Sequence, residues 1–273
     1  MSFIVIPSRT AGTMASIDHN TEPLLPEPLL PEPLLKVQGI SKRFGGLTAL
    51  ESVDLTINQG EIVGLIGPNG AGKTTLFSVV SGYYGPTGGK IIFDGEDITG
   101  LKPHKICNRG IARTFQIPKP FLHLSVVENM LVGASFGAGH SSRQAAMEGV
   151  LEILRWSGLA DKAWMPADTL NLVQRKKLEL ARALSTVPQL ILLDEVIAGL
   201  NPTEAAEMVS FITTLRQRNI TVLIIEHIMK VIMNVSERII VLDQGKKICE
   251  GPPAVVANDA RVVEAYLGVQ GHA

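Results

Sequence analysis

Residues 67–75 read GPNGAGKTT, and they lie between the apolar run EIVGLI and a segment with helical spacing that starts near Lys73. The stretch matches Gly-x-x-x-x-Gly-Lys-Thr, a pattern that wraps a phosphate group when it joins a buried strand to a helix. Backbone N–H groups and the positive end of the helix dipole attract the phosphate oxygens. Because the pattern and both of its neighbours agree, we predict a nucleotide-phosphate site here and not a chance glycine-rich turn.

Each position of this loop is expected to contribute to nucleotide binding. Lys73 reaches the oxygens of the β- and γ-phosphates, and the Thr74 hydroxyl is placed to bind Mg²⁺. Glycines let the backbone approach the phosphate closely because they have no side chain. The predicted nucleotide-binding residues of the loop are Gly67, Pro68, Asn69, Gly70, Ala71, Gly72, Lys73, Thr74 and Thr75.

A pair of acidic residues ends a second apolar run, LILLDE at 190–195. A carboxylate at the end of a buried strand beside a phosphate loop holds the metal shell of a bound nucleotide, so Asp194 is a predicted Mg²⁺ ligand. The adjacent Glu195 is expected to point at the γ-phosphate and to polarise the attacking water. Two adjacent carboxylates with these roles predict that the nucleotide is hydrolysed and not merely stored.

The base of the nucleotide is encoded less directly. Guanine-specific switch proteins carry [Asn/Thr]-Lys-x-Asp, and this chain contains no such tetrapeptide, which favours adenine. Adenine needs only an apolar or aromatic platform. Phe44, upstream of the loop, is a candidate platform, although a phenylalanine packed in the core fits the same sequence.

Short apolar runs alternate with segments of helical spacing along most of the chain. Early alternating runs at 34–44 and 49–57 suit half-buried strands. Later runs are continuous and bounded by turns, as in a parallel sheet that is buried on both faces. These later runs are 189–195, 220–227 and 238–245. Residues 118–172 are mostly helical in pattern, so we predict an α/β fold with a parallel sheet core and a helical insertion.

The N-terminal residues differ in composition from the rest of the chain. Residues 21–35 contain three Glu-Pro-Leu-Leu units, and a proline every two or three residues prevents a regular helix. We predict a disordered Pro-rich extension at 1–34 and an ATPase domain at 35–273, with the helical subdomain inserted at about 118–180. A docking peptide for a grooved partner is the alternative interpretation of the extension.

Composition argues against several classes of protein. The formal net charge is −1, so we expect no basic surface for nucleic acid. Cys107 and Cys249 lack metal-ligand spacing, which argues against a disulfide framework or a metal–thiolate site. No run approaches the ~18 apolar residues of a membrane span, and the apolar start lacks the basic segment of a signal peptide. We expect a cytoplasmic protein.

With these motifs in place, residues 35–268 resemble the ATP-binding cassette (ABC) family of P-loop NTPases. The family joins a parallel sheet core to a small antiparallel β subdomain and an inserted helical subdomain. By this resemblance ATP and Mg²⁺ are the cofactors, and Phe44 stacks on adenine. Gln116, in ARTFQ, would bind the metal and link the γ-phosphate to a membrane partner. His227, in LIIEH, would contact the γ-phosphate, so the implied catalytic residues are Glu195, His227 and Gln116.

Within the family, the chain is most similar to the ATPases of branched-chain amino-acid uptake. The segments that carry this likeness are RFGGLTAL, GIARTFQIPKPF, ENMLVG, AGLNP, EHIMKVIM and the terminal VVEAYLG. The likeness implies a peripheral subunit on the cytoplasmic face of the membrane, paired with a second ATPase subunit, the same or different, beneath two permeases. A solute-binding protein outside the membrane would deliver the solute. Import of urea or amides is one alternative, and a soluble ABC protein with a non-transport partner is another.

The segment LNLVQ at 170–174 occupies the place of the family signature Leu-Ser-Gly-Gly-Gln, which holds the γ-phosphate bound to the opposite subunit. Gln174 stands in its expected position. Asn171 can cap the helix and donate to a phosphate oxygen as a serine would. Val173 replaces a glycine, so we expect its branched side chain to crowd the phosphate and to weaken hydrolysis at the partner's site. The extreme case would be a regulatory subunit with negligible turnover.

A plainer interpretation makes the same segment the start of an amphipathic surface helix, and the two interpretations are compatible. It expects Leu178, Ala181 and Leu184 to be buried. The side chains that it expects to be solvated are Arg175, Lys176 and Lys177.

Overall fold

The computed structural model describes residues 32–137 and 142–267. The extension predicted at 1–34 therefore lies outside the described residues except for its last three positions, and the boundary at residue 35 stays a prediction. The strands are β1 (Leu35–Phe44), β2 (Leu47–Ile57), β3 (Ile62–Ile66), β4 (Gly88–Phe93), β5 (Glu96–Asp97), β6 (Ile111–Arg113), β7 (Leu190–Asp194), β8 (Thr221–Ile225), β9 (Arg238–Asp243) and β10 (Lys246–Gly251). The α-helices are α1 (Lys73–Val80), α2 (Pro103–Cys107), α3 (Val126–Ala134), α4 (Arg143–Trp156), α5 (Leu172–Leu184), α6 (Pro202–Gln217), α7 (Met229–Val235), α8 (Pro253–Ala257) and α9 (Ala260–Leu267).

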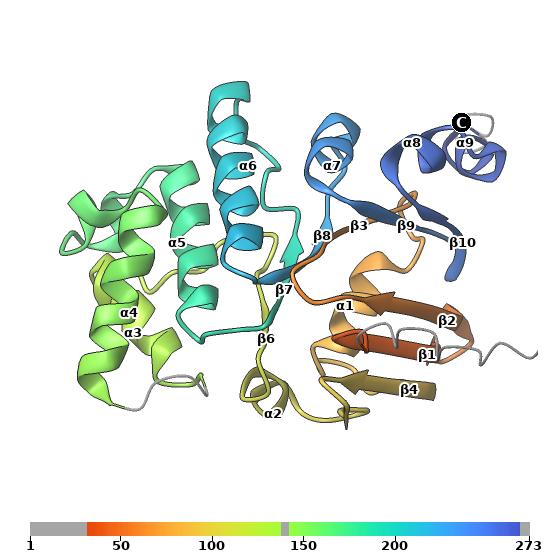
Figure 1. Ribbon diagram of the computed structural model, residues 1–273, viewed down its shortest axis with the longest axis horizontal. Helices are drawn as coiled ribbons and strands as arrows, with labels where there is room; N and C mark the ends of the chain where they lie inside the picture. The colour runs from red at the N-terminus through yellow and green to blue at the C-terminus, as the bar shows by residue number, and fades with distance from the viewer. Residues whose placement is uncertain (1–31, 138–141, 268–273) are drawn as a thin grey trace, which may run out of the picture. The chain divides into compact units, whose positions relative to one another are not determined.

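The larger sheet has its strands in the order β10-β9-β3-β8-β7-β6 (Figure 1). The neighbouring strands from β9 to β6 are parallel, whereas β10 pairs antiparallel with β9 at one edge. Every residue of β3, β7 and β8 is buried, which explains why these strands read as continuous apolar runs. The predicted parallel core is confirmed, and the short strand β6 and the antiparallel edge strand β10 had no counterpart among the predicted runs.

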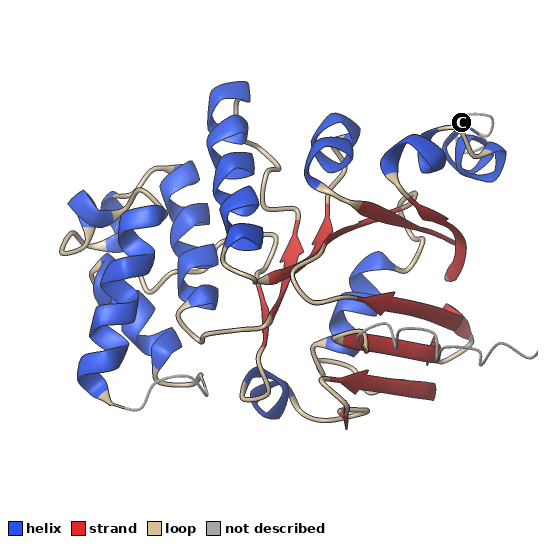
Figure 2. Cartoon of the chain, in the orientation of Figure 1, coloured by secondary structure: helices blue, strands red, loops and turns tan. Residues whose placement is uncertain are grey.

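Helices cover both faces of this sheet (Figure 2). Successive side chains of a strand point to opposite faces, so each strand contributes to two cores. In β8, Val222 and Ile224 belong to the buried cluster that includes α6 and α7, whereas Leu223 and Ile225 belong to the cluster that includes α1. This packing fixes the carboxyl ends of β3, β7 and β8 at one edge, where the loop at 67–75 and the residues after β7 and β8 begin.

A second, antiparallel sheet has the strand order β2-β1-β4-β5. Its apolar side chains join the same buried cluster as α1. The two-residue turn between β4 and β5 is formed by Asp94 and Gly95, whose φ angles of 49° and 77° are typical of the tightest hairpins. The Asp-Gly pair is a common sequence for such a turn, because both positions need a positive φ.

Three helices, α3, α4 and α5, pack together with no strand between them (Figure 2). They share a buried cluster that includes Val127, Met130, Val150, Leu154 and Leu178. The helical pattern of 118–172 is confirmed, although α5 continues four residues past the predicted limit of the subdomain, which stays a prediction. Within the described residues, no helix has both the length and the apolar character needed to cross a membrane.

Candidate nucleotide site

The loop at 67–75 starts directly after β3, and its last three residues are the first residues of α1, which begins at Lys73 as predicted. Gly67, Gly70 and Gly72 have φ angles of 148°, 81° and 101°, a backbone region that residues other than glycine rarely adopt. A Cβ on Gly67 would lie 2.0 Å from the Leu242 carbonyl oxygen, and one on Gly72 would lie 2.6 Å from the Ala49 carbonyl oxygen. Backbone shape and close neighbours therefore both require glycine at the two outer positions.

The Lys73 side chain is held against its own loop. It is 6% exposed, and its Nζ donates to the carbonyl oxygens of Gly67 at 2.7 Å and Pro68 at 2.9 Å. Burial lowers the pKa of the Lys73 ammonium, and the Glu195 and Asp194 carboxylates oppose that shift. The two carbonyls thus fix the position of the ammonium before any ligand arrives.

A cavity of about 410 Å³ surrounds the loop. Its walls are Phe44, the first three residues of β2, residues 69–75, Glu195 and His227. These groups come from four separate stretches of sequence, and the fold brings them together at one edge of the larger sheet. The signature residues Asn171, Val173 and Gln174 do not line this cavity.

Phe44 ends β1 at the mouth of the cavity and is 40% exposed, so it is not a core side chain. Its ring contacts Tyr84 edge-on, with 5.1 Å between the ring centroids. The Lys42 ammonium lies 4.9 Å from the centroid of the Phe44 ring. The core alternative for this phenylalanine is therefore wrong, and the ring is an exposed aromatic surface that lines the cavity.

Glu195 is held by two side chains from other elements. Its Oε2 accepts a hydrogen bond from Gln116 Nε2 at 2.6 Å, and its Oε1 lies 2.7 Å from His227 Nε2. Gln116 follows β6 and His227 follows β8, the strands on either side of β7. The Glu195 backbone is left-handed, with φ at 52°, and its N–H donates to the Ile225 carbonyl oxygen. Two of the three predicted catalytic residues, Gln116 and His227, thus lie within hydrogen-bonding distance of the third, Glu195.

Asp194 lies on the opposite side of the strand end, where it forms a buried ion pair with Arg113 at 3.0 Å. Burial raises the pKa of Asp194, and the Arg113 guanidinium opposes that shift. Arg113 also donates to the hydroxyls of Ser78 and Ser81, at 3.1 and 3.3 Å. Arg113 lies within ARTFQ, and no role was predicted for it from the sequence. The feature that marks Arg113 as a partner of Asp194 is its position at the end of β6, beside β7.

The predicted Mg²⁺ ligands, Thr74, Gln116 and Asp194, are all oxygen donors, which is the ligand type that Mg²⁺ prefers. Arg113 engages one carboxylate oxygen of Asp194, Oδ2, so the other is the one available to a metal. Among the described residues, no group of three or more His, Cys, Asp or Glu side chains is placed to hold a metal ion. The three predicted ligands are therefore of the type that fits Mg²⁺.

The signature segment begins α5 with a complete capping box. Asn171 Oδ1 accepts from the Gln174 N–H at 3.0 Å, and Gln174 Oε1 accepts from the Asn171 N–H at 3.1 Å. Val173 is buried, whereas Leu172 is 46% exposed beside Gly199 of the AGLNP segment. The capping expected of Asn171 is confirmed. The side chain that stands on the surface of this helix start is that of Leu172.

One expectation of the plainer interpretation is wrong. Leu178, Ala181 and Leu184 are buried as expected, but Lys176 is only 6% exposed. Its Nζ donates to the Glu195 carbonyl oxygen at 3.3 Å. Burial lowers the pKa of Lys176, and three neighbouring carboxylates oppose that shift. Lys176 is therefore turned inward because acidic groups and the Glu195 carbonyl oxygen lie behind α5, which helical periodicity alone does not reveal.

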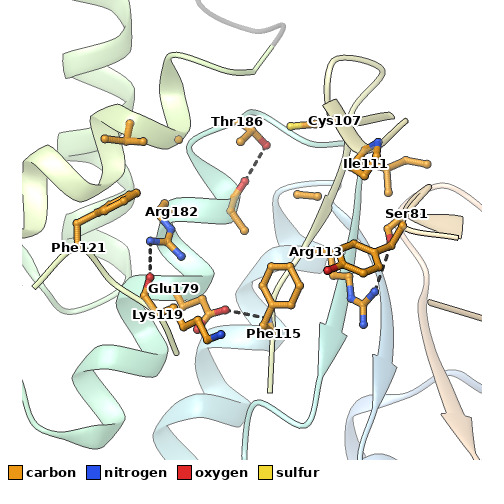
Figure 3. A pocket seen from close by; sticks show the side chains of 16 residues that line it. Ser81, Cys107, Ile111, Arg113, Phe115, Lys119, Phe121, Glu179, Arg182 and Thr186 are labelled. Carbon is orange, nitrogen blue, oxygen red and sulfur yellow. Dashed lines mark hydrogen bonds between the residues drawn. The ribbon is translucent and has the colours of Figure 1, made fainter. Parts of the chain in front are cut away.

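A second cavity of about 400 Å³, here called the Phe115 groove, lies between α5 and β6 (Figure 3). Phe115, Phe121 and Arg182 line it, and the Arg182 guanidinium lies 5.6 Å from the centroid of the Phe121 ring. Glu179 Oε1 accepts from the Phe115 N–H at 2.8 Å. Because Phe115 precedes Gln116, this bond ties the segment that carries Gln116 to α5. The Phe115 groove had no counterpart among the predictions from sequence.

The parallel sheet with its glycine-rich loop between β3 and α1, together with the antiparallel sheet and the helical layer, defines a P-loop ATPase of the cassette type. A model of the ABC transporter family matches residues 50–198, and a model described as a branched-chain amino acid ATP-binding cassette transporter matches residues 246–272. The chain belongs to the ABC transporter family.

Curated relatives extend this likeness over most of the chain. The high-affinity branched-chain amino acid transport ATP-binding protein BraF of Pseudomonas aeruginosa is 42% identical over 248 residues, covering 86% of this chain and 97% of that protein. LivG of Escherichia coli, with the same description, is 40% identical over 248 residues, with 86% and 97% coverage.

Solved structures agree with the fold. The ADP conformation of an ATP-binding cassette of an ABC transporter superposes with a TM-score of 0.79 at 34% identity, covering 86% of this chain and 99% of that one. A dimeric cassette in a post-hydrolysis state, bound to ADP and Pi, gives a TM-score of 0.70 at 26% identity, with 80% and 98% coverage.

Proposed function

We propose that this chain is the ATP-hydrolysing subunit of an ABC importer for branched-chain amino acids. The names of the relatives and the match at residues 246–272 support the solute class. The observation that carries the hydrolytic part is Glu195, which is held by Gln116 and His227 at the wall of the loop cavity. A carboxylate fixed in this way is positioned to take a proton from water without having to reorganise.

In the proposed mechanism the chain's own groups divide the work. Phe44 stacks on the adenine, the N–H groups of the loop bind the phosphates, and Lys73 neutralises charge on the β- and γ-oxygens. Glu195 polarises the attacking water, and His227 contacts the γ-phosphate. Thr74, Gln116 and Asp194 would hold Mg²⁺, which when bound neutralises charge that develops on the phosphate oxygens.

The proposed partners follow from the same arrangement. A second ATPase subunit, the same or different, would complete each nucleotide site with its signature helix, and the dimeric cassette structure supports such pairing. Two permease subunits would bind on the membrane side, with Gln116 reporting the nucleotide to them. The Phe115 groove supports this because it presents aromatic rings beside Arg182, next to the segment of Gln116. A solute-binding protein would act indirectly, the subunit would lie on the cytoplasmic face, and no nucleic acid is involved.

The test is ATP turnover in the transporter reconstituted with its permeases and binding protein. Glu195→Gln should lower turnover by about 10²- to 10⁴-fold, because the general base is lost, while MgATP still binds and holds the dimer closed. Glu148→Gln, an exposed change on α4, serves as the control and should leave turnover unchanged. Unaltered hydrolysis by Glu195→Gln would exclude its role. Stimulation by urea and not by leucine, isoleucine or valine would exclude the solute class.

A further inference from the structure

The terminal segment VVEAYLG touches the nucleotide loop, although it plays no part in the mechanism above. Its residues up to position 267 form the end of α9. The Tyr266 hydroxyl accepts a hydrogen bond from the Gly67 N–H at 2.9 Å, across 199 residues of sequence. Gly67 is the first residue of the loop. The C-terminal helix therefore contacts the chain at the point where β3 ends and the phosphate-binding loop begins.

The Gly67 N–H needs a partner because it is buried beyond the end of a strand. The pairing of β3 with β9 ends at Ile66, which lies opposite Val241, so the ladder does not extend to Gly67. Gly67 itself is buried. A buried N–H without an acceptor destabilises the folded state, and the phenol oxygen of Tyr266 removes that cost.

The same glycine is held from its other side by the loop lysine. Lys73 Nζ donates to the Gly67 carbonyl oxygen at 2.7 Å. Contacts through both its N–H and its C=O therefore fix the orientation of Gly67. Since glycine at a φ of 148° has many other conformations within reach, contacts and not local sterics hold it there. Loss of the Tyr266 contact would free one half of this clamp.

The helix that carries Tyr266 is anchored independently of the loop. Val262 is buried in the cluster that also contains Tyr266 and the apolar side chains of β9. Asp259, just before α9, accepts from the Arg261 N–H at 2.9 Å. Burial raises the pKa of Tyr266, and the Gly67 N–H opposes that shift, so the residue remains a neutral phenol at neutral pH. The hydroxyl is therefore presented by a packed helix and not by a free tail.

We infer that Tyr266 is a positioning residue for nucleotide binding, and that α9 sets the affinity of this chain's own phosphate loop by holding Gly67 in its binding conformation. A preordered loop loses less conformational freedom when the ligand binds, so affinity rises without any new ligand contact. The inference rests on the proposed role of the 67–75 loop in binding ATP. It gives the C-terminal segment a function within the nucleotide site.

The test replaces Tyr266 by phenylalanine, which removes the hydroxyl and keeps the ring. The dissociation constants of MgATP and MgADP, and the KM and kcat of the reconstituted transporter, are measured beside those of Glu264→Gln, an exposed change on the same helix. Loss of one hydrogen bond should raise the dissociation constants and KM about 3- to 10-fold, with kcat within about twofold of wild type. The control should match wild type. Equal affinities in Tyr266→Phe and wild type would overturn the inference.

Two further variants separate positioning from general stability. Val262→Ala weakens the packing of α9 but keeps the hydroxyl, so it should lower Tm while changing nucleotide affinity less than Tyr266→Phe does. If affinity instead followed Tm across both variants, the role of Tyr266 would be structural and the inference wrong. Lys73→Ala reports on the loop itself. If wild type bound MgATP no better than Lys73→Ala, the proposed function would fail, which is a different outcome from failure of the Tyr266 variant.

Discussion

The loop at 67–75 and the start of α5 at 170–174 both occupy positions where the family pattern has glycines for phosphate, yet only the loop has kept them. In the loop the glycines have positive φ angles, and carbonyl oxygens lie where the Cβ atoms of Gly67 and Gly72 would be. At the start of α5, Asn171 has a φ of −71° and caps an ordinary helix. Residues with side chains can therefore replace the glycines at the start of α5 without a change in backbone conformation. The comparison shows that the backbone conformation of the loop excludes side chains at its glycine positions. At the signature, only the need to bind the ligand would select for glycine.

The largest effect is expected from Gly67→Ala. Its Cβ would lie 2.0 Å from the Leu242 carbonyl oxygen, in a left-handed backbone region, so we expect the free energy of unfolding to fall by about 3–5 kcal/mol. Gly70→Ala is the matched control, since its φ is 81° but nothing lies within 4 Å of the new Cβ. It should cost about 1–2 kcal/mol, from backbone strain alone. Denaturant titration measures both. Equal losses would show that crowding does not protect the loop.

An intermediate effect is expected from Val173→Gly, and it should have opposite signs for stability and activity. Removing a buried side chain and adding a helical glycine should lower the free energy of unfolding by about 2–3 kcal/mol. Restoring the glycine should raise ATP turnover of the assembled transporter at least about 10-fold if residue 173 limits the approach of the helix start to the phosphate, although the valine side chain itself is buried.

Val173→Ala distinguishes the two contributions to that result. It removes most of the buried side chain but keeps a Cβ, so it should share much of the stability loss and little of the gain in turnover. Turnover that stays at the wild-type level in Val173→Gly would show that the altered signature does not limit hydrolysis.

The smallest effect is expected from Asn171→Ala, which removes one half of the capping box. The Gln174 N–H loses its acceptor, so the unfolding free energy should fall by about 1 kcal/mol, or about 2–4 °C in Tm. Asn171→Ser keeps a capping oxygen and should restore most of the loss. If alanine and serine gave the same Tm, the cap would contribute nothing to the stability of the helix start.

Motifs with a fixed local spacing could be predicted from sequence, and so could the strands that are buried on both faces. The loop, the run that ends at Asp194 and the helix start at Lys73 all lie where their patterns place them. A resemblance to a known family was needed for Gln116 and His227, because a lone glutamine or histidine carries no pattern. The structure then brings both onto Glu195.

Contacts between distant segments could not be predicted, because neither partner has a periodic signal. Arg113 pairs with Asp194 across 81 residues, and Tyr266 reaches Gly67 across 199. Lys176 was expected in water because periodicity describes a helix without its neighbours, and the acidic groups behind α5 come from other elements. Each of these residues connects a motif to a part of the fold that the motif itself does not specify.

The left-handed backbone of Glu195 has a consequence for how this site can change over evolutionary time. A residue other than glycine in this conformation costs about 1–2 kcal/mol, and the strain is relieved only by residues without a Cβ or with short polar side chains. Mutational drift toward stability at position 195 therefore favours glycine or asparagine, neither of which can take a proton from water. In the proposed mechanism, hydrolysis needs a carboxylate at this position, so the chain carries this backbone strain to keep the general base.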